Sequence, residues 1–263
     1  MLPPLRALCV ATAWWCVTAC ADQQRSEILV LAASSLTDAF QELEREHERQ
    51  NPGIDVQLSF AGSSVLAMQL EQGGAGDVLA TASEEHMQKL VDAHAIGEHA
   101  VFAYNELVVA VPANNPARLE RFEDLARVPR VVLGTADVPV GKYADALIER
   151  ARSKLGSAFS DGVYAHVVSR EANVRLVLAK VALGEADAAI VYRSDVKEGR
   201  TKAIEVPPEL RERATYPIGV AARAKQPRLA RAFMAYVLSD EGQAVLGKHR
   251  LIPARASQTA AAK

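Results

Sequence analysis

Short apolar runs alternate with amphipathic segments along most of the chain. Residues 28–33 are apolar throughout, which is typical of a parallel strand buried on both faces. Residues 36–43 then carry apolar side chains at helical spacing, and a Pro-Gly turn at 52–53 ends that segment. The same order repeats twice before residue 92. The pattern predicts an α/β fold with doubly wound sheets.

The remaining segments extend this pattern through a second series. We predict strands at 28–33, 54–60, 77–80, 106–112, 130–133, 163–168, 188–192 and 214–221. We predict further helices at 142–154, 174–183, 227–238 and 241–249. Ser35, with Asp38 three residues on, predicts a capping box at the first helix. The tail at 255–263 is small and polar, and we expect it to be flexible.

The first twenty residues differ from the rest and predict an export signal. They carry one charge, Arg6, and residues 7–19 are nearly all apolar, a run too short to span a membrane. The segment ends in Val-Thr-Ala-Cys, which resembles a bacterial lipobox. This predicts a signal peptide at 1–19 and a lipidated Cys20 at the new N-terminus. Ordinary signal peptidase could instead remove residues 1–21. Either route predicts a periplasmic protein, lipid-anchored in the first case only.

Composition narrows the function of the exported part. The chain has 263 residues, 49% hydrophobic and 24% charged, with a formal net charge of -2. Those values exclude a disordered chain and a strongly basic nucleic-acid binder. All three cysteines and both tryptophans lie within residues 1–20. The exported chain therefore has no disulfide and no thiol-based metal site or nucleophile, apart from Cys20 itself.

Four predicted helices begin directly after a strand with small, hydroxyl or apolar residues. These starts are at Ser34-Ser35, Ser63-Ser64, Pro139-Val140 and Asn173-Val174. A helix start presents unpaired N–H groups, which suit an anion, and such starts gather at the carboxyl ends of strands in α/β sheets. Each one alone is also an ordinary helix cap. No nucleotide-binding loop, hydrolase elbow or paired histidine motif is present.

Five separated stretches resemble the molybdate-binding proteins of bacterial ABC importers, a solute-binding protein family. The stretches are AASSLTDA (32–39), FAGSSVLA (60–67), VPVGKYA (138–144), NVR (173–175) and IVYRSD (190–195). They follow the family's order and spacing, and the resemblance spans about residues 27–254. It implies a two-lobed, type II periplasmic-binding-protein fold with the ligand in the cleft between the lobes.

The resemblance also implies the ligand-binding residues. Ser35 and Ser63 would donate through hydroxyl and N–H, Val140 and Val174 through backbone N–H, and Tyr192 through its phenol. The adjacent serines leave two registers open, Ser34 or Ser35 and Ser63 or Ser64. Val140 departs from the family's frequent alanine, which could narrow the pocket. No residue is expected to bind a metal cation directly.

The implied organisation assigns 27–105 and 218–254 to a first lobe and 106–217 to a second. The strands near 107–111 and 216–220 would act as the hinge. The protein would be a monomer that binds molybdate or tungstate without a cofactor or catalysis, closes around it, and delivers it to an ABC permease and its ATPase. Two alternatives stay open: a binding protein for another oxyanion such as sulfate, and a secreted hydrolase using Ser35 or Ser63.

Overall fold

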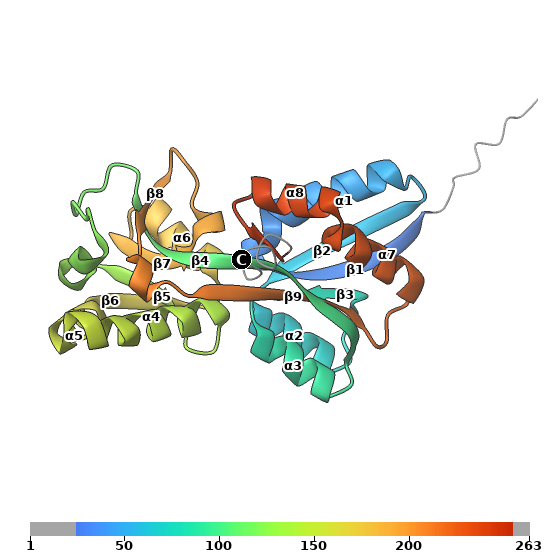
Figure 1. Ribbon diagram of the computed structural model, residues 1–263, viewed down its shortest axis with the longest axis horizontal. Helices are drawn as coiled ribbons and strands as arrows, with labels where there is room; N and C mark the ends of the chain where they lie inside the picture. The colour runs from blue at the N-terminus through green and yellow to red at the C-terminus, as the bar shows by residue number, and fades with distance from the viewer. Residues whose placement is uncertain (1–24, 255–263) are drawn as a thin grey trace, which may run out of the picture.

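Two lobes lie side by side in the computed structural model, which describes residues 25–254 (Figure 1). Each lobe is a mixed sheet flanked by helices, and two long strands, β4 and β9, run from one lobe into the other. This is the two-lobed α/β architecture implied by the resemblance. The predicted signal segment, Cys20 and the tail at 255–263 lie outside the described residues. No helix within residues 25–254 is both long and apolar enough to cross a membrane.

The first lobe is built on three parallel strands in the order β2-β1-β3. Strand β9 lies antiparallel to β3, and β4 lies antiparallel to β9, with β10 on the other edge of β4. The strands are β1 (Ser26–Ala33), β2 (Ile54–Ala61), β3 (Val78–Ala80), β4 (Ile96–Pro112), β9 (Arg213–Ala221) and β10 (Ile252–Pro253). The helices are η1 (Ser34–Leu36), α1 (Thr37–Gln50), α2 (Ser63–Glu71), α3 (Glu84–Asp92), α7 (Pro227–Leu238) and α8 (Asp240–Lys248).

The second lobe continues from the far end of β4. There β4 pairs with β7 and β8 on its two sides, and β7 leads to β5 and then β6. The strands are β5 (Val131–Gly134), β6 (Val167–Glu171), β7 (Ala188–Tyr192) and β8 (Thr201–Glu205). The helices are η2 (Phe122–Arg127), α4 (Pro139–Leu155), α5 (Ser157–Ala165), α6 (Val174–Ala182), η3 (Arg193–Asp195) and η4 (Pro208–Leu210).

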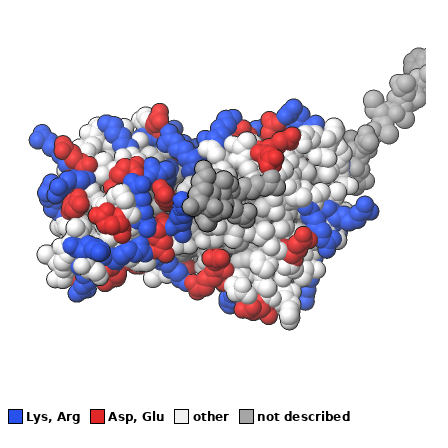
Figure 2. Space-filling model, in the orientation of Figure 1, with Lys and Arg blue, Asp and Glu red and all other residues white. Residues whose placement is uncertain are grey.

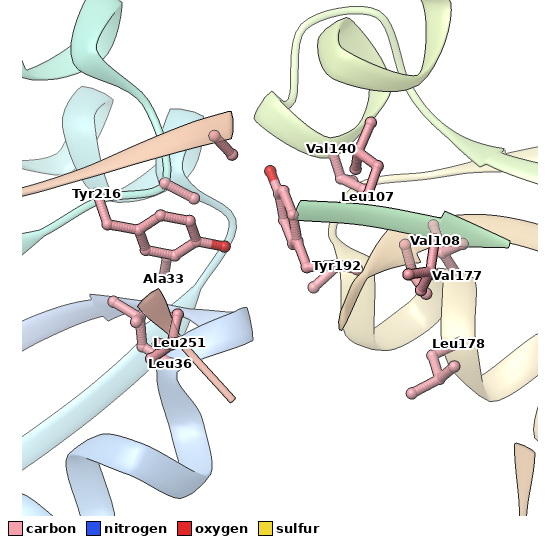
Figure 3. Packing of buried hydrophobic residues seen from close by; sticks show 14 of the residues in the cluster. Ala33, Leu36, Leu107, Val108, Val140, Val177, Leu178, Tyr192, Tyr216 and Leu251 are labelled. Carbon is pink, nitrogen blue, oxygen red and sulfur yellow. The ribbon is translucent and has the colours of Figure 1, made fainter. Parts of the chain in front are cut away.

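The change of sheet occurs within β4. Its residues from Ile96 to Glu106 pair with β9, and those from Leu107 onward pair with β7 and β8. Buried side chains pack on both sides of the junction: Tyr216 projects from the first lobe, and Tyr192 projects from the second (Figure 3). The two rings lie 5.7 Å apart at 74°. The lobes therefore meet through aromatic side chains as well as through two continuous strands.

The structure corrects two local predictions. The strand predicted at 163–168 is wrong in its first half, because Val163 lies in α5 and β6 begins only at Val167. Phe159 and Val163 are four residues apart and both buried, a helical spacing that a six-residue window hides. The capping box is also wrong: α1 has no side-chain cap, and the Thr37 hydroxyl donates to the Ser34 carbonyl instead, at 2.7 Å.

Candidate functional site

A small cavity lies between the lobes, at the carboxyl ends of β1, β2 and β7. Both lobes contribute to it, and no charged side chain among residues 25–254 lines it. The lining residues are Ala33, Ser34, Ser35, Gly62, Ser63, Ala82, Val138, Pro139, Val140, Asn173, Val174 and Tyr192. Its polar groups are therefore hydroxyls, one side-chain amide and backbone groups, set among apolar side chains.

All five residues singled out from the sequence line this cavity. Ser35 and Ser63 come from the first lobe, and Val140, Val174 and Tyr192 come from the second. Their exposed fractions are 6%, 2%, 2%, 3% and 2% in that order. At the first double serine both Ser34 and Ser35 reach the cavity. At the second, Ser63 lines the cavity, whereas Ser64 lines a separate groove between α2, α3 and the start of α4. Folding thus gathers residues that lie up to 157 positions apart.

The two serine hydroxyls are held with their protons free. Ser35 Oγ accepts a hydrogen bond from the Tyr216 hydroxyl at 3.1 Å. Ser63 Oγ accepts one from the backbone N–H of Ala82, also at 3.1 Å. A hydroxyl has a single proton, and an oxygen that already accepts a bond directs that proton elsewhere. Each serine can therefore donate into the cavity.

Tyr192 supplies a third hydroxyl donor. Its side chain is buried, and its hydroxyl has no hydrogen bond of acceptable geometry to any residue in the described range. The ring is held edge-on between Tyr143 and Tyr216, with ring centres 6.4 Å and 5.7 Å away. Burial, aided by the neighbouring tyrosines, raises the pKa of Tyr192 well above its ordinary value. The phenol therefore keeps its proton at neutral pH and acts as a donor.

Backbone N–H groups complete the set of donors. Helices α2, α4 and α6 all begin at the cavity, and N–H groups in the first turn of a helix have no acceptor within it. Pro139 opens α4, so its first available N–H is that of Val140. In α6 the Asn173 side chain accepts from the Leu176 N–H at 3.1 Å and leaves the Val174 N–H for the cavity. Each start also adds the positive end of a helix dipole.

The lobes are in contact around this cavity. A Cβ added to Gly62 of the first lobe would lie 2.7 Å from the carbonyl oxygen of Ala172 in the second. Lys142 of α4 forms an ion pair with Glu85 of α3 across the cleft, at 2.6 Å. The structure is thus a closed form, and Gly62 is required because a side chain at this position would separate the two backbones.

Tyr216 and Ala82 are site residues that the sequence did not point to. Tyr216 lies in a strand whose apolar pattern suggests only packing, and Ala82 contributes through its backbone. Their roles depend on partners 181 and 19 residues away, so no local signal could have identified them.

The cavity does not provide what a serine hydrolase requires. In the part of the chain that the structure describes, no histidine, aspartate or glutamate lines it, so no general base from these residues accompanies Ser35 or Ser63 in the cavity. Residues 25–254 also contain no group of three His, Cys, Asp or Glu side chains placed to hold a metal ion. The groups that line the cavity are instead arranged to donate hydrogen bonds to a ligand.

Comparison with known proteins gives the family. Residues 28–249 match the pattern that defines the bacterial extracellular solute-binding proteins. The chain belongs to this family. Members of the family bind solutes outside the cytoplasm and are not enzymes. The resemblance inferred from the sequence motifs is confirmed.

Two curated relatives and one solved structure are similar over most of the chain. The molybdate-binding protein ModA of Mycobacterium tuberculosis is 37% identical over 228 residues, 85% of this chain and 84% of its own. A putative ABC transporter substrate-binding lipoprotein of Bacillus subtilis, YvgL, is 30% identical over 90% of this chain and 94% of its own. The substrate binding domain of a putative molybdenum ABC transporter from Clostridium difficile superposes with a TM-score of 0.67, at 26% identity, covering 87% of this chain and 99% of that one. The type II periplasmic-binding-protein fold is thereby confirmed.

Proposed function

We propose that the protein binds molybdate, and with it tungstate, outside the cytoplasm and delivers it to an ABC importer. The observation that supports this proposal is that the hydroxyl groups of Ser35, Ser63 and Tyr192 are all free to donate a hydrogen bond. Val140 and Val174 add backbone donors at helix starts. Similarity to ModA of M. tuberculosis supports the choice of ligand.

Neutral donors are sufficient for a buried dianion. Each helix start carries about half a positive charge, and α2, α4 and α6 all begin at the cavity. These dipoles are fixed before the ligand arrives, so closure requires little reorganisation. No charged side chain among residues 25–254 lines the cavity, and both acidic and basic side chains occur on the visible face of each lobe (Figure 2). Binding therefore rests on direct hydrogen bonds and not on a basic cluster.

The described residues that line the cavity include no carboxylate or imidazole to accept a proton from the ligand, which selects against protonated anions. Hydrogen phosphate would turn its proton toward donors, a mismatch that costs roughly 1–3 kcal/mol. Sulfate is a dianion without a proton and does not suffer this mismatch, so its rejection depends on its size. Its shorter bonds would lengthen every hydrogen bond in a rigid cage. Tungstate is close to molybdate in size and would bind similarly.

Transport would use the two-lobe architecture. Donors from both lobes favour the closed form, since neither lobe alone satisfies the ligand. The closed monomer, with no cofactor and no catalytic step, would dock on a membrane permease driven by an ATPase. Opening there would release the anion to the permease.

The site of action follows from the N-terminal segment. We propose that Cys20, after removal of residues 1–19, carries a lipid that anchors the protein to a membrane. The Val-Thr-Ala-Cys sequence and the similarity to the lipoprotein YvgL support this. Expression with radiolabelled palmitate, beside a Cys20→Ala control, tests it: label only in the unaltered chain is expected. Mature protein beginning at Asp22 would instead indicate ordinary signal peptidase.

Calorimetric titration tests the ligand assignment. Exported protein is titrated with molybdate, tungstate, sulfate and phosphate at one pH and ionic strength. Saturable binding of molybdate and tungstate, with sulfate at least about a hundredfold weaker and phosphate undetected, is expected. Tight sulfate binding without molybdate binding would make the protein a sulfate-binding member of the family. Covalent modification of Ser35 or Ser63 by a serine-directed phosphonate would revive the hydrolase alternative.

A further inference from the structure

A guanidinium group crosses the cleft directly behind the cavity. Arg175 follows Val174 in the first turn of α6, in the second lobe. Its Nε donates to the backbone carbonyl of Ser34 at 3.1 Å, and its Nη2 donates to Asp38 Oδ2 at 2.8 Å. Both acceptors belong to the first lobe. Arg175 directly follows Val174, whose N–H is one expected donor to the ligand. It is also hydrogen-bonded to the peptide group that carries a second expected donor, the Ser35 N–H.

The carbonyl oxygen of Ser34 accepts several hydrogen bonds. It accepts from the Thr37 hydroxyl at 2.7 Å and from the Thr37 N–H, in addition to Arg175. A peptide whose oxygen accepts several bonds, one of them charge-assisted, becomes more polarised, and its N–H becomes a better donor. The positive charge of Arg175 thus acts on the cavity without lining it.

The other groups around Arg175 fit the same arrangement. Asp38 also pairs with Lys197 of the second lobe at 2.6 Å. Burial favours the neutral form of Asp38, but hydrogen bonds from Lys197 and Arg175 outweigh it and lower the pKa. On the second lobe, the buried Asp195 places Oδ1 3.6 Å from Nε of Arg175. Asp195 and Arg175 belong to the same lobe and would stay together if the lobes separated. Ser34 and Asp38 belong to the other lobe and would move away from Arg175.

We propose that Arg175 is a positioning residue that couples lobe closure to oxyanion binding. In the closed form it fastens α6 to the Ser34–Asp38 segment and strengthens the Ser35 N–H as a donor. In an open form those two contacts are lost, and Asp195 retains the guanidinium at the edge of the cleft. This inference rests on the proposed function, because it assumes an anion in the cavity.

The chain offers a matched control in Arg170. Its Nη1 donates to the Gly134 carbonyl at 2.9 Å, and its Nη2 donates to Asp145 Oδ1 at 2.8 Å. The exposed fractions of the two ion pairs are alike, 30% and 28% for Arg170–Asp145 against 29% and 30% for Arg175–Asp38. Both partners of Arg170, however, lie in the second lobe. Arg170→Gln therefore removes a similar pair of contacts without affecting closure.

The test compares Arg175→Gln, Arg175→Lys and Arg170→Gln. Molybdate affinity and dissociation rate are measured, with X-ray scattering with and without molybdate and the melting temperature of ligand-free protein. Arg175→Gln is expected to bind about 10–100-fold more weakly, mainly through faster dissociation, since one charge-assisted bond and the polarised peptide are lost. Arg175→Lys should recover part of the loss. Arg170→Gln should stay within about twofold of the unaltered protein.

The outcomes separate the two proposals. Equal affinities of Arg175→Gln and Arg170→Gln would overturn the inference, while molybdate binding by the unaltered protein would leave the proposed function standing. A weaker Arg175→Gln whose melting temperature falls in parallel would also overturn it, because that result indicates a structural contact present in both forms. No molybdate binding by the unaltered protein would remove the proposed function itself, and tight sulfate binding would move the same Arg175 test to sulfate.

Discussion

At the scale of single residues, the site depends on how hydroxyl protons are directed. Ser35 and Ser63 each accept one internal hydrogen bond, so each turns its proton toward the cavity. Tyr192 differs, because its buried hydroxyl makes no hydrogen bond of acceptable geometry to a described residue. An unpaired buried hydroxyl is costly, which indicates that an acceptor is supplied from outside.

Replacing either serine should weaken molybdate binding without unfolding the protein. Ser35→Ala and Ser63→Ala each remove one donor to a charged acceptor, so we expect roughly 10–100-fold weaker binding by calorimetry. Ser64→Ala is the control, since Ser64 lines a separate groove. Unchanged affinity in both Ser35→Ala and Ser63→Ala would refute the site. A loss in Ser64→Ala alone would shift the register by one residue.

Tyr192→Phe should separate binding from stability. The ring stays packed between Tyr143 and Tyr216, and the hydroxyl makes no hydrogen bond of acceptable geometry to any residue from 25 to 254. The melting temperature of ligand-free protein should therefore be unchanged or slightly higher, while molybdate affinity falls about tenfold or more. A lower melting temperature with unchanged affinity would show that the hydroxyl supports the fold and not the ligand.

At the scale of elements, the order of strands and helix starts creates the site. Strands β1, β2 and β7 end at the cavity, and α2, α4 and α6 begin there. Parallel strands in each lobe bring the helix starts to the edge that faces the other lobe. The donors are consequently placed by regular elements and not by long loops.

Gly62→Ala should hinder closure. The added methyl group would meet the Ala172 carbonyl of the opposite lobe at 2.7 Å, and the backbone dihedrals of Gly62 (φ -64°, ψ 141°) suit alanine. Ligand-free stability should therefore change little, while molybdate affinity falls at least about tenfold and the scattering profile with molybdate stays expanded. Gly53→Ala is the control, because nothing lies within 4 Å of its added Cβ. Unaltered compaction in Gly62→Ala would exclude this contact as the limit to closure.

At the scale of the whole molecule, closure buries charge as well as the cavity. Asp195 is fully buried, and neither carboxylate oxygen accepts a hydrogen bond from a described residue. Burial, together with the charge of Asp38, outweighs the attraction of Arg175 and Lys197 and raises the pKa of Asp195 to about 7. The native state therefore holds a proton here that the unfolded chain releases above about pH 4.

The contribution of Asp195 to stability should fall as pH rises from about 4 to about 7, and stay flat above that. The native state binds the extra proton in this window, so unfolding becomes easier as protons are removed. Asp195→Asn cannot ionise. Its free energy of unfolding in urea, relative to the unaltered protein, should rise by on the order of 1–3 kcal/mol between pH 5 and pH 8. The exposed Asp161→Asn variant should show no such change. A constant difference for Asp195→Asn would contradict the shifted pKa.

Sequence periodicity alone predicts the alternation of strands and helices and the positions where helices begin at small or hydroxyl residues. Those features depend on neighbours within a few residues, so periodicity and turn residues reveal them. The five motifs then sufficed to identify the family. Helix α5 escaped detection because a short apolar run fits a strand as well as a helix. Strand β8 (TKAIE) carries too few apolar residues to signal itself.

Only the tertiary structure decided how the donors are directed and what joins the lobes. The hydrogen bond from Tyr216 to Ser35 links residues 181 positions apart, and that from Arg175 to Ser34 links residues 141 apart. Such pairs form where the fold brings the ends of different strands together. The sequence around each residue does not indicate a partner so far away along the chain. Five of the residues that line the cavity could therefore be named from the sequence. The directions of the hydroxyl protons, the close approach at Gly62 and the contacts of Arg175 across the cleft required the folded chain.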